Sequence, residues 1–295
     1  MVIINSEGKF NENTYLVDGQ LFSLAGMLSI YIIEKDDMRI MIDTPQDMMA
    51  RKFVKKLIEF ELYPIHKILL THSHFDHIQS VGKLMKLMKE TEIEVLASEN
   101  AIKNLKDPES YNKDYDMRVR PIEEVTPLKG GDIIDLKGLE LEVLNFFGHS
   151  QDSIAILDKE NNNIFVGDAI MMRWDPETPT VPIMPPDFSE SELLKTFEKL
   201  RNLKGKINSI SFAHFGAYID EDCDKIIDEM QELYFNVKSS LIKWYNENPS
   251  IDYIVPLYYD KFTPNSKIES RENPVLLKMV LGWAMEGMKK SGFIS

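Results

Sequence analysis

The sequence predicts a layered α/β protein in which two β-sheets pack face to face and helices cover their outer faces. Residues 13–70 and 132–170 each contain β-branched or aromatic runs separated by turn residues. Each of these β-rich blocks is followed by segments whose apolar residues have helical spacing. Beyond residue 216 only long helical patterns remain, so we also expect a helical C-terminal segment.

The first half alternates strands and helices. Strands are expected in NTYLV, MLSIYIIE and RIMID, which are separated by Asp-Gly at 18–19 and Lys-Asp-Asp at 35–37, both typical of turns. From Pro45 a helical stripe begins, made of Met48, Met49, Phe53, Leu57 and Ile58. A strand HKILLTH, a helix over 78–89 and a strand EIEVLAS follow, and this β-α-β-α order indicates a layered α/β architecture.

The second half repeats this organisation. After an irregular, charged stretch over 106–125 come four strand-like runs, DIIDL, LELEVLNFF, SIAILD and NIFVGDAI, with a hairpin turn at the Asn-rich residues 161–163. A helix over 188–203 and a strand INSISFAH close the pattern. Helical spacing then runs from Ile226 to Trp244 until Asn-Glu-Asn-Pro breaks it. We therefore expect a first domain over 1–216 and a helical extension over 217–295 that docks on it.

Composition excludes several classes of protein. With 34 Lys and Arg against 48 Asp and Glu, the chain carries −14 and repels phosphate backbones, so no nucleic-acid partner is expected. The single Cys223 permits no intramolecular disulfide and no thiolate-rich zinc site. The N-terminal residues lack a leader pattern, and the apolar stretch PVLLKMVLGWAMEGMKK is interrupted by Lys278 and Glu286. We expect a cytoplasmic protein without membrane contact that acts on a small molecule; a homodimer stays open.

The chemistry is concentrated in Thr71-His72-Ser73-His74-Phe75-Asp76-His77, at the end of the strand HKILLT. His72 and His74 point to the same side of an extended chain because side chains alternate with period two, so they can chelate one metal ion. Asp76 and His77, one turn later, can serve a second ion. Imidazole and carboxylate without sulfur suit zinc first, with iron, manganese or cobalt as alternatives.

Later strands supply more ligands of the same kind. His149 follows LEVLNFFG, Asp168 follows IFVG, and His214 follows SISFA. Each is a polar residue directly after a buried strand, so we expect them to converge with the motif on one pocket. The sixth histidine, His66, precedes its strand and is expected at the surface.

Four segments together carry a family resemblance: THSHFDH at 71–77, FGHSQDSI at 147–154, FVGDAI at 165–170 and AHFG at 213–216. They resemble the metallo-β-lactamase fold superfamily, and within it the glyoxalase II-like dinuclear hydrolases. The resemblance implies an αββα four-layer sandwich over residues 1–216, with the site at the edge where strand ends meet. By matching position it implies one metal held by His72, His74 and His149, and a second held by Asp76, His77 and His214. Asp168 would bridge the two metals. Asp43 would support a ligand histidine without binding metal itself.

The resemblance also implies an activity. Two divalent ions per chain, with zinc preferred and iron or manganese as alternatives, would share a hydroxide that attacks a thioester, a lactone or a related ester-like bond. Asp76 and Asp168 would then be catalytic as well as ligands, and no serine or cysteine nucleophile is required. The loop after Asp168 and the residue just past AHFG are candidate pocket walls. Their candidate substrate contacts are Arg173, Trp174 and Tyr218, each of which could instead be solvated or packed.

Two other functions stay open. A non-haem iron persulfide dioxygenase shares most of these ligands, and a non-catalytic binding protein could use the same fold. One departure from the family pattern is Phe147, which stands where glyoxalase-like segments usually have proline before Gly-His. Substrate identity lies beyond the sequence, because specificity in this superfamily sits in loops and appendages.

Overall fold

Two seven-stranded sheets form the centre of the computed structural model, which describes residues 3–170, 173–175, 177–214 and 216–295. The first sheet contains, in spatial order, β2 (Gly8–Lys9), β3 (Thr14–Asp18), β4 (Ser29–Lys35), β5 (Met38–Ile42), β6 (Lys67–Leu70), β7 (Glu94–Ser98) and β8 (Thr126–Leu128). The second contains β1 (Ile3–Ile4), β14 (Ala217–Ile219), β13 (Ser209–Phe212), β12 (Asn163–Gly167), β11 (Ile154–Asp158), β10 (Leu139–Asn145) and β9 (Ile133–Leu136).

Strand direction decides where loops from the two sheets meet. In the first sheet, β5, β6, β7 and β8 pair in parallel, so the carboxyl ends of these strands share one edge. In the second sheet, β12 and β13 also pair in parallel, whereas their other neighbours are antiparallel. Polar residues that follow β6 therefore lie at the edge of the first sheet where its parallel strands end. Those that follow β12 and β13 lie at the corresponding edge of the second sheet.

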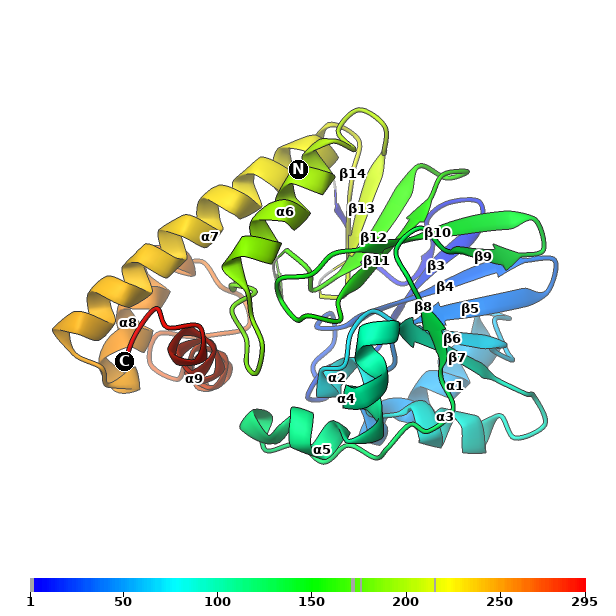
Figure 1. The fold of residues 1–295 in the computed structure, drawn as a ribbon, viewed down its shortest axis with the longest axis horizontal. Helices are drawn as coiled ribbons and strands as arrows, with labels where there is room; N and C mark the ends of the chain where they lie inside the picture. The colour runs from blue at the N-terminus through cyan, green and yellow to red at the C-terminus, as the bar shows by residue number, and fades with distance from the viewer. Residues whose placement is uncertain (1–2, 171–172, 176, 215) are drawn as a thin grey trace.

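Helices cover the outer faces of both sheets (Figure 1). On the first sheet lie η1 (Asp47–Met49), α1 (Ala50–Glu59), α2 (Phe75–Ile78), α3 (Val81–Leu87), η2 (Glu99–Ala101), α4 (Ile102–Lys106), α5 (Pro108–Tyr111) and η3 (Lys113–Tyr115). On the second lie α6 (Glu190–Arg201) and α7 (Glu221–Glu247), followed by α8 (Ile251–Phe262) and α9 (Val275–Lys290). This is the predicted four-layer order of helix, sheet, sheet and helix.

The alternating side chains of the strands explain the layers. In β4, Tyr31 and Ile33 point into the core between the sheets, where they join Leu141 and Phe165 of the second sheet. Ile32, between them, joins the cluster under α1 and α3 instead. A strand buried on both faces needs apolar residues at consecutive positions, which is why MLSIYIIE has no polar alternation.

Several elements differ from the expectation. The helix expected over 78–89 is interrupted, since α2 ends at Ile78 and α3 begins at Val81. The charged stretch over 106–125 contains α5 and η3, and the short strand β8 follows it. The stripe expected after Pro45 was wrong at two positions, because Met48 and Ile58 are 67% and 57% exposed. The first residues after 216 form β14, which pairs with β13 in the second sheet.

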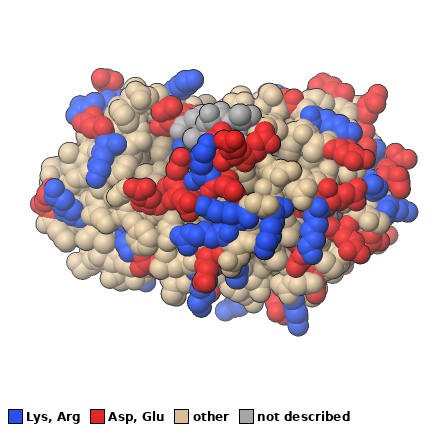
Figure 2. All heavy atoms as spheres, turned by 90° about the horizontal axis from the view of Figure 1, so that it is seen from above, with Lys and Arg blue, Asp and Glu red and all other residues tan. Residues whose placement is uncertain are grey.

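The C-terminal helices pack against both halves of the molecule. α9 contributes Leu281 and Met288 to the cluster on the second sheet, and Leu276 and Val280 to the cluster on the first. In the described part of the chain, no helix is both long and apolar enough to span a bilayer. Figure 2 shows one face on which basic and acidic side chains are interspersed, with a short basic stripe bordered by carboxylates.

Candidate metal centre

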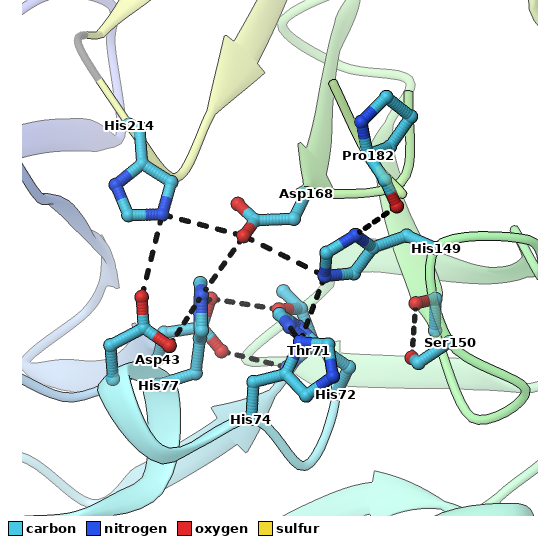
Figure 3. A network of polar contacts seen from close by, with 12 residues as sticks. Asp43, Thr71, His72, His74, His77, His149, Ser150, Asp168, Pro182 and His214 are labelled. Atoms are coloured by element: carbon cyan, nitrogen blue, oxygen red, sulfur yellow. Dashed lines mark hydrogen bonds and ion pairs between the residues drawn. The ribbon is translucent and has the colours of Figure 1, made fainter. Parts of the chain in front are cut away.

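Seven predicted side chains meet at the edge where strands of both sheets end, and six of them are labelled in Figure 3. All seven are buried, with no more than 8% of any residue exposed. They come from the loop after β6 and from α2 (His72, His74, Asp76 and His77), from the loop after β10 (His149), from the end of β12 (Asp168) and from the end of β13 (His214). The structure thus brings together every residue that the sequence placed in the metal site.

Asp43 and Thr71 fix the loop that carries the motif. The Asp43 carboxylate accepts hydrogen bonds from the Thr71 backbone N–H (2.7 Å), from the Thr71 hydroxyl (2.8 Å) and from Nδ1 of His77 (2.8 Å). Asp43 itself has φ +61°, a left-handed conformation that Asp tolerates better than most residues. Gly167 lies against Thr71 so closely that a Cβ on Gly167 would lie 2.7 Å from the Thr71 hydroxyl oxygen. The ends of β6 and β12 are therefore held together just before the ligands.

The candidate ligand atoms form three overlapping groups. Atoms of His72, His74 and His149 lie within 4.8 Å of one another, as do those of His72, His77 and Asp168, and those of Asp76, His77 and His214. Oδ2 of Asp168 lies 3.3 Å from Nε2 of His77, 3.3 Å from Nε2 of His214 and 3.8 Å from Nε2 of His149. Asp168 therefore lies between a three-imidazole cluster and an Asp-His-His cluster (Figure 3).

Each ligand imidazole donates its outer N–H to an oxygen. Nδ1 of His149 donates to the Pro182 carbonyl (2.9 Å), Nδ1 of His214 to the Met27 carbonyl (2.7 Å) and Nε2 of His74 to the Pro185 carbonyl (3.1 Å). Nδ1 of His77 donates to Asp43. The Thr71 hydroxyl gives its proton to Asp43, so its oxygen accepts from Nδ1 of His72 at 3.1 Å. A neutral imidazole carries one N–H, so in the neutral form the inner nitrogen of each ring is a bare lone pair.

These bare nitrogens face one another without protons between them. Nδ1 of His74 lies 2.9 Å from Nε2 of His72 and 2.9 Å from Nε2 of His149, and two lone pairs at that distance make no hydrogen bond. Nε2 of His77, Nε2 of His214 and Oδ1 of Asp168 are buried without a hydrogen-bond partner. Buried polar atoms left unpaired are costly, and a cation is the partner that satisfies nitrogen lone pairs and carboxylates together. The donor set fits divalent metal ions.

Electrostatics divide the centre into two parts. Burial, together with the neighbouring imidazoles, holds the pKa of His72 and His74 well below the usual range, and burial lowers the pKa of His149. Neutral imidazoles are the form that binds metal.

The other cluster is dominated by carboxylates. Burial disfavours the charged form of His77, but Asp76 and Asp43 outweigh burial and raise its pKa well above the usual range. Burial likewise opposes charge on Asp168, yet His214 and His77 hold the pKa of Asp168 well below its usual range. Asp168 and these imidazoles therefore stabilise each other's charged forms.

The remaining predicted residues lie outside this centre. A cavity of about 20 Å³ beside the ligands is lined by His74, Asp76, His149 and Asp168 together with Phe75, Tyr115, Met184 and Trp283. Arg173, Trp174 and Tyr218 are buried and are not among its lining residues. Met171, Met172 and Pro176 of the loop after Asp168, and Phe215 of AHFG, lie outside the described residues. Cys223 is buried, and burial raises the pKa of its thiol to about 12.

Sequence reasoning missed Tyr115 and Trp283. The Tyr115 hydroxyl donates to the Pro185 carbonyl at 2.5 Å and lies 3.2 Å from Nε2 of His74, so it helps to hold this imidazole. Two tyrosines, Tyr111 and Tyr115, within the otherwise charged stretch DPESYNKDYD were the signal that could have found it. Trp283 lies in the apolar stretch PVLLKMVLGWAMEGMKK, in which no local pattern marks it as a pocket residue.

The model of the Metallo-beta-lactamase superfamily matches residues 25–214, more than half of the 295-residue chain. The chain belongs to the metallo-beta-lactamase superfamily. A metallo-beta-lactamase family protein from Thermus thermophilus has the same fold, with a TM-score of 0.64 and 18% identity over 95% of this chain and 94% of that one. The predicted superfamily and fold are thereby confirmed.

Three relatives within the superfamily carry names of hydrolases. The chain is 26% identical over 226 residues to an atrochrysone carboxyl ACP thioesterase of Paecilomyces divaricatus, which covers 75% of this chain and 60% of that one. It is 24% identical over 164 residues to the human acyl-coenzyme A thioesterase MBLAC2, a match that covers 50% of this chain and 55% of that one. It is 28% identical over 127 residues to the hydroxyacylglutathione hydrolase GloC of Haemophilus influenzae, a match that covers 41% of this chain and 57% of that one. The chain spans less than two thirds of the length of each of these relatives.

Proposed function

We propose that this chain is a metal-dependent thioester hydrolase with two divalent ions per site, zinc being the preferred metal and iron or manganese the alternatives. The observation that carries the proposal is the set of five imidazoles whose inner nitrogens converge, with Asp168 between the two clusters. Imidazole and carboxylate without sulfur suit these metals. Three ligands for each ion leave coordination positions for water and substrate.

The names of the relatives support a thioester as the substrate. Acyl carrier protein, coenzyme A and glutathione, which appear in these three names, are all thiol carriers of acyl groups. A lactone or a related ester presents a similar carbonyl to the site, so it is the second substrate class of the proposal. The sequence identities to these relatives are 24–28%. The acyl group and its thiol carrier are therefore to be identified by experiment.

The side chains of the site have different roles in this proposal. When bound, paired divalent ions lower the pKa of a shared water toward neutrality and polarise a carbonyl oxygen. His72, His74 and His149 would hold one ion, and Asp76, His77 and His214 the other. Asp168 reaches both clusters and would fix their separation.

Asp76 has a second role in this proposal. Its carboxylate lies 3.6 Å from Nε2 of His214 and its side chain is 11% exposed, and it lines the cavity beside the ligands. A carboxylate at that place can accept a proton from the attacking water and transfer it to the leaving thiolate, which departs as the thiol. The hydrogen bond from His77 to Asp43 keeps the neighbouring imidazole in the correct orientation during this exchange.

The test measures hydrolysis of a panel of coenzyme A and glutathione thioesters and lactones, before and after chelation and after return of zinc, iron or manganese. We expect chelation to abolish hydrolysis and one metal to restore it. Asp168→Asn should lower kcat/KM by about 100-fold or more, because even residues that only support ligands cause losses of that size. Asp158→Asn is the matched control, since Asp158 is equally buried but lies at the far end of β11 and should retain activity.

Three outcomes would contradict the proposal. Consumption of oxygen by an iron-loaded protein that hydrolyses none of the panel would point to a persulfide dioxygenase. A protein that binds no metal under any of these conditions would point to a non-catalytic binding role. Hydrolysis that survives complete metal removal would exclude the mechanism itself.

We further propose a cytoplasmic protein that acts on a small molecule, binds no nucleic acid and has residues 217–295 as a docked extension; a homodimer is one option for its assembly. The single, buried Cys223 suits a reducing compartment. The mixed charge of the face in Figure 2 and the net charge of −14 fit a protein without a phosphate-backbone partner.

A further inference from the structure

The space beside the ligands is closed on one side by apolar side chains. The cavity of about 20 Å³ is comparable with the room that one water molecule needs. One wall is formed by ligands and the other by Phe75, Tyr115, Met184 and Trp283. Any substrate group larger than a water molecule must therefore lie against this apolar wall or displace part of it.

Three aromatic rings make most of this wall. The Trp283 ring lies 5.0 Å from that of Tyr115 and 5.9 Å from that of Phe75, both edge to face, and Phe75 lies 5.3 Å from Tyr115. Such contacts are favourable and hold rings in fixed orientations. Tyr115 is in turn 5.2 Å from the ring of the ligand His74. Trp283 thus reaches the metal centre through two rings that contact or flank ligands.

Trp283 comes from a different part of the chain than the other wall residues. It lies on α9, which passes beside the loop that carries Met184 (Figure 1). Gly287, one turn further on, packs so tightly that a Cβ there would lie 2.9 Å from the Met184 backbone. This close approach holds α9, and with it Trp283, against the cavity.

Among the four wall residues, Trp283 can change without disturbing the ligands. Phe75 stands between the ligands His74 and Asp76, and Tyr115 hydrogen-bonds Pro185 beside His74. Trp283 is partly buried, and its ring contacts those of Phe75 and Tyr115. Its size therefore sets the space beside the ligands, while its removal leaves the ligand hydrogen bonds in place.

We propose that Trp283 determines specificity by limiting the length of the acyl group that can lie beside the metal ligands. This inference rests on the proposed thioester hydrolysis. The acyl group is assigned to this wall because the wall is apolar, whereas the thiol carriers in the names of the relatives are large and polar. Met184 adds an adaptable surface, and the flat Trp283 indole contributes the largest ring of the wall.

The test uses metal-loaded protein and two readouts. Binding of acetate, butanoate, hexanoate and octanoate, the carboxylate products, is measured by titration calorimetry, and kcat/KM is measured on the matching coenzyme A thioesters. We expect the wild type to favour short chains. Trp283→Ala should raise the octanoate-to-acetate ratio by at least about 10-fold in both readouts, since each methylene accommodated in an apolar pocket is worth about that factor. Trp283→Phe should give an intermediate shift.

Trp244→Phe is the matched control. Trp244 also lies in the C-terminal helices, but it packs against Phe262 and is not a cavity residue, so this variant should keep the wild-type profile. Metal content and melting temperature of each variant establish that the fold is retained.

The outcomes separate the two proposals. An unchanged chain-length profile in metal-loaded Trp283→Phe and Trp283→Ala would overturn the role of Trp283, whatever the activity. A shifted carboxylate profile in a protein that hydrolyses no thioester would support the role of Trp283 and contradict thioester hydrolysis. A shift of equal size in Trp244→Phe would overturn the role as well, because it would indicate a general loosening of the C-terminal helices.

Discussion

At the scale of single residues, the candidate site depends as much on hydrogen-bond acceptors as on ligands. Every ligand imidazole has its outer N–H held by a carbonyl, a carboxylate or a hydroxyl oxygen. The candidate ligands were predictable from the sequence, since HxHxDH and the three residues after strands stand out, and the structure brings them together. The acceptors were not, because backbone carbonyls such as those of Met27 and Pro182 have no sequence signature.

Asp43 gives the residue-scale prediction. Asp43→Asn keeps the side-chain shape and tolerates the φ of +61° but offers fewer acceptor positions to Thr71 and His77. We expect zinc affinity, measured by competition with a chromophoric chelator, to fall by about 10- to 100-fold, with the fold retained. Asp36→Asn is the control, because Asp36 is exposed and also has a positive φ (+47°). Equal affinities in both variants would show that Asp43 does not support the ligand.

At the scale of elements, helices position the ligand loops more tightly than the sequence suggested. The loop of His149 is bound to α6, because Ser189 N–H donates to the Gly148 carbonyl at 2.8 Å and the Thr196 hydroxyl donates to the Phe147 carbonyl at 2.8 Å. The sequence predicted α6 and the ligand but not their contact, since nothing local encodes which helix covers which loop. The interruption between α2 and α3 was missed for a similar reason: the carbonyl of His77 accepts from Thr44, a residue distant in the chain.

Gly148 gives the element-scale prediction. It has φ +137°, and a Cβ would lie 2.5 Å from the Leu193 backbone in α6. Gly148→Ala should therefore move the His149 loop away from α6 and lower both zinc affinity and melting temperature, with a cost of about 1–3 kcal/mol.

Gly138→Ala separates the clash from the backbone strain. Gly138 has φ +91° and nothing within 4 Å of its Cβ position, so this variant carries only the conformational penalty. Zinc affinity should stay at the wild-type value in Gly138→Ala. If both variants lost equal affinity, the contact between α6 and the His149 loop would have no special role in positioning the ligand.

At the scale of the whole molecule, two sheets place their strand ends at one edge, and the ligands come from both. The alternation of strand and helix patterns predicted these layers, because burial on one or both faces leaves a period in the sequence. The positions of α8 and α9 could not be predicted, since their apolar faces fit many surfaces and only long-range packing selects one. Trp283 reaches the cavity wall through that packing, so no local pattern in the sequence could identify it.

The central claim is that this edge of the molecule holds two divalent ions, and the count of ions per chain tests it most directly. We would measure it by native mass spectrometry of protein purified without added metal and then titrated with zinc. We predict two ions per chain in the wild type and in His66→Ala, whose histidine lies outside the ligand groups, and a single ion in His214→Ala. A wild-type chain that binds no ion, or one that binds two equally well after loss of His214, would contradict the claim.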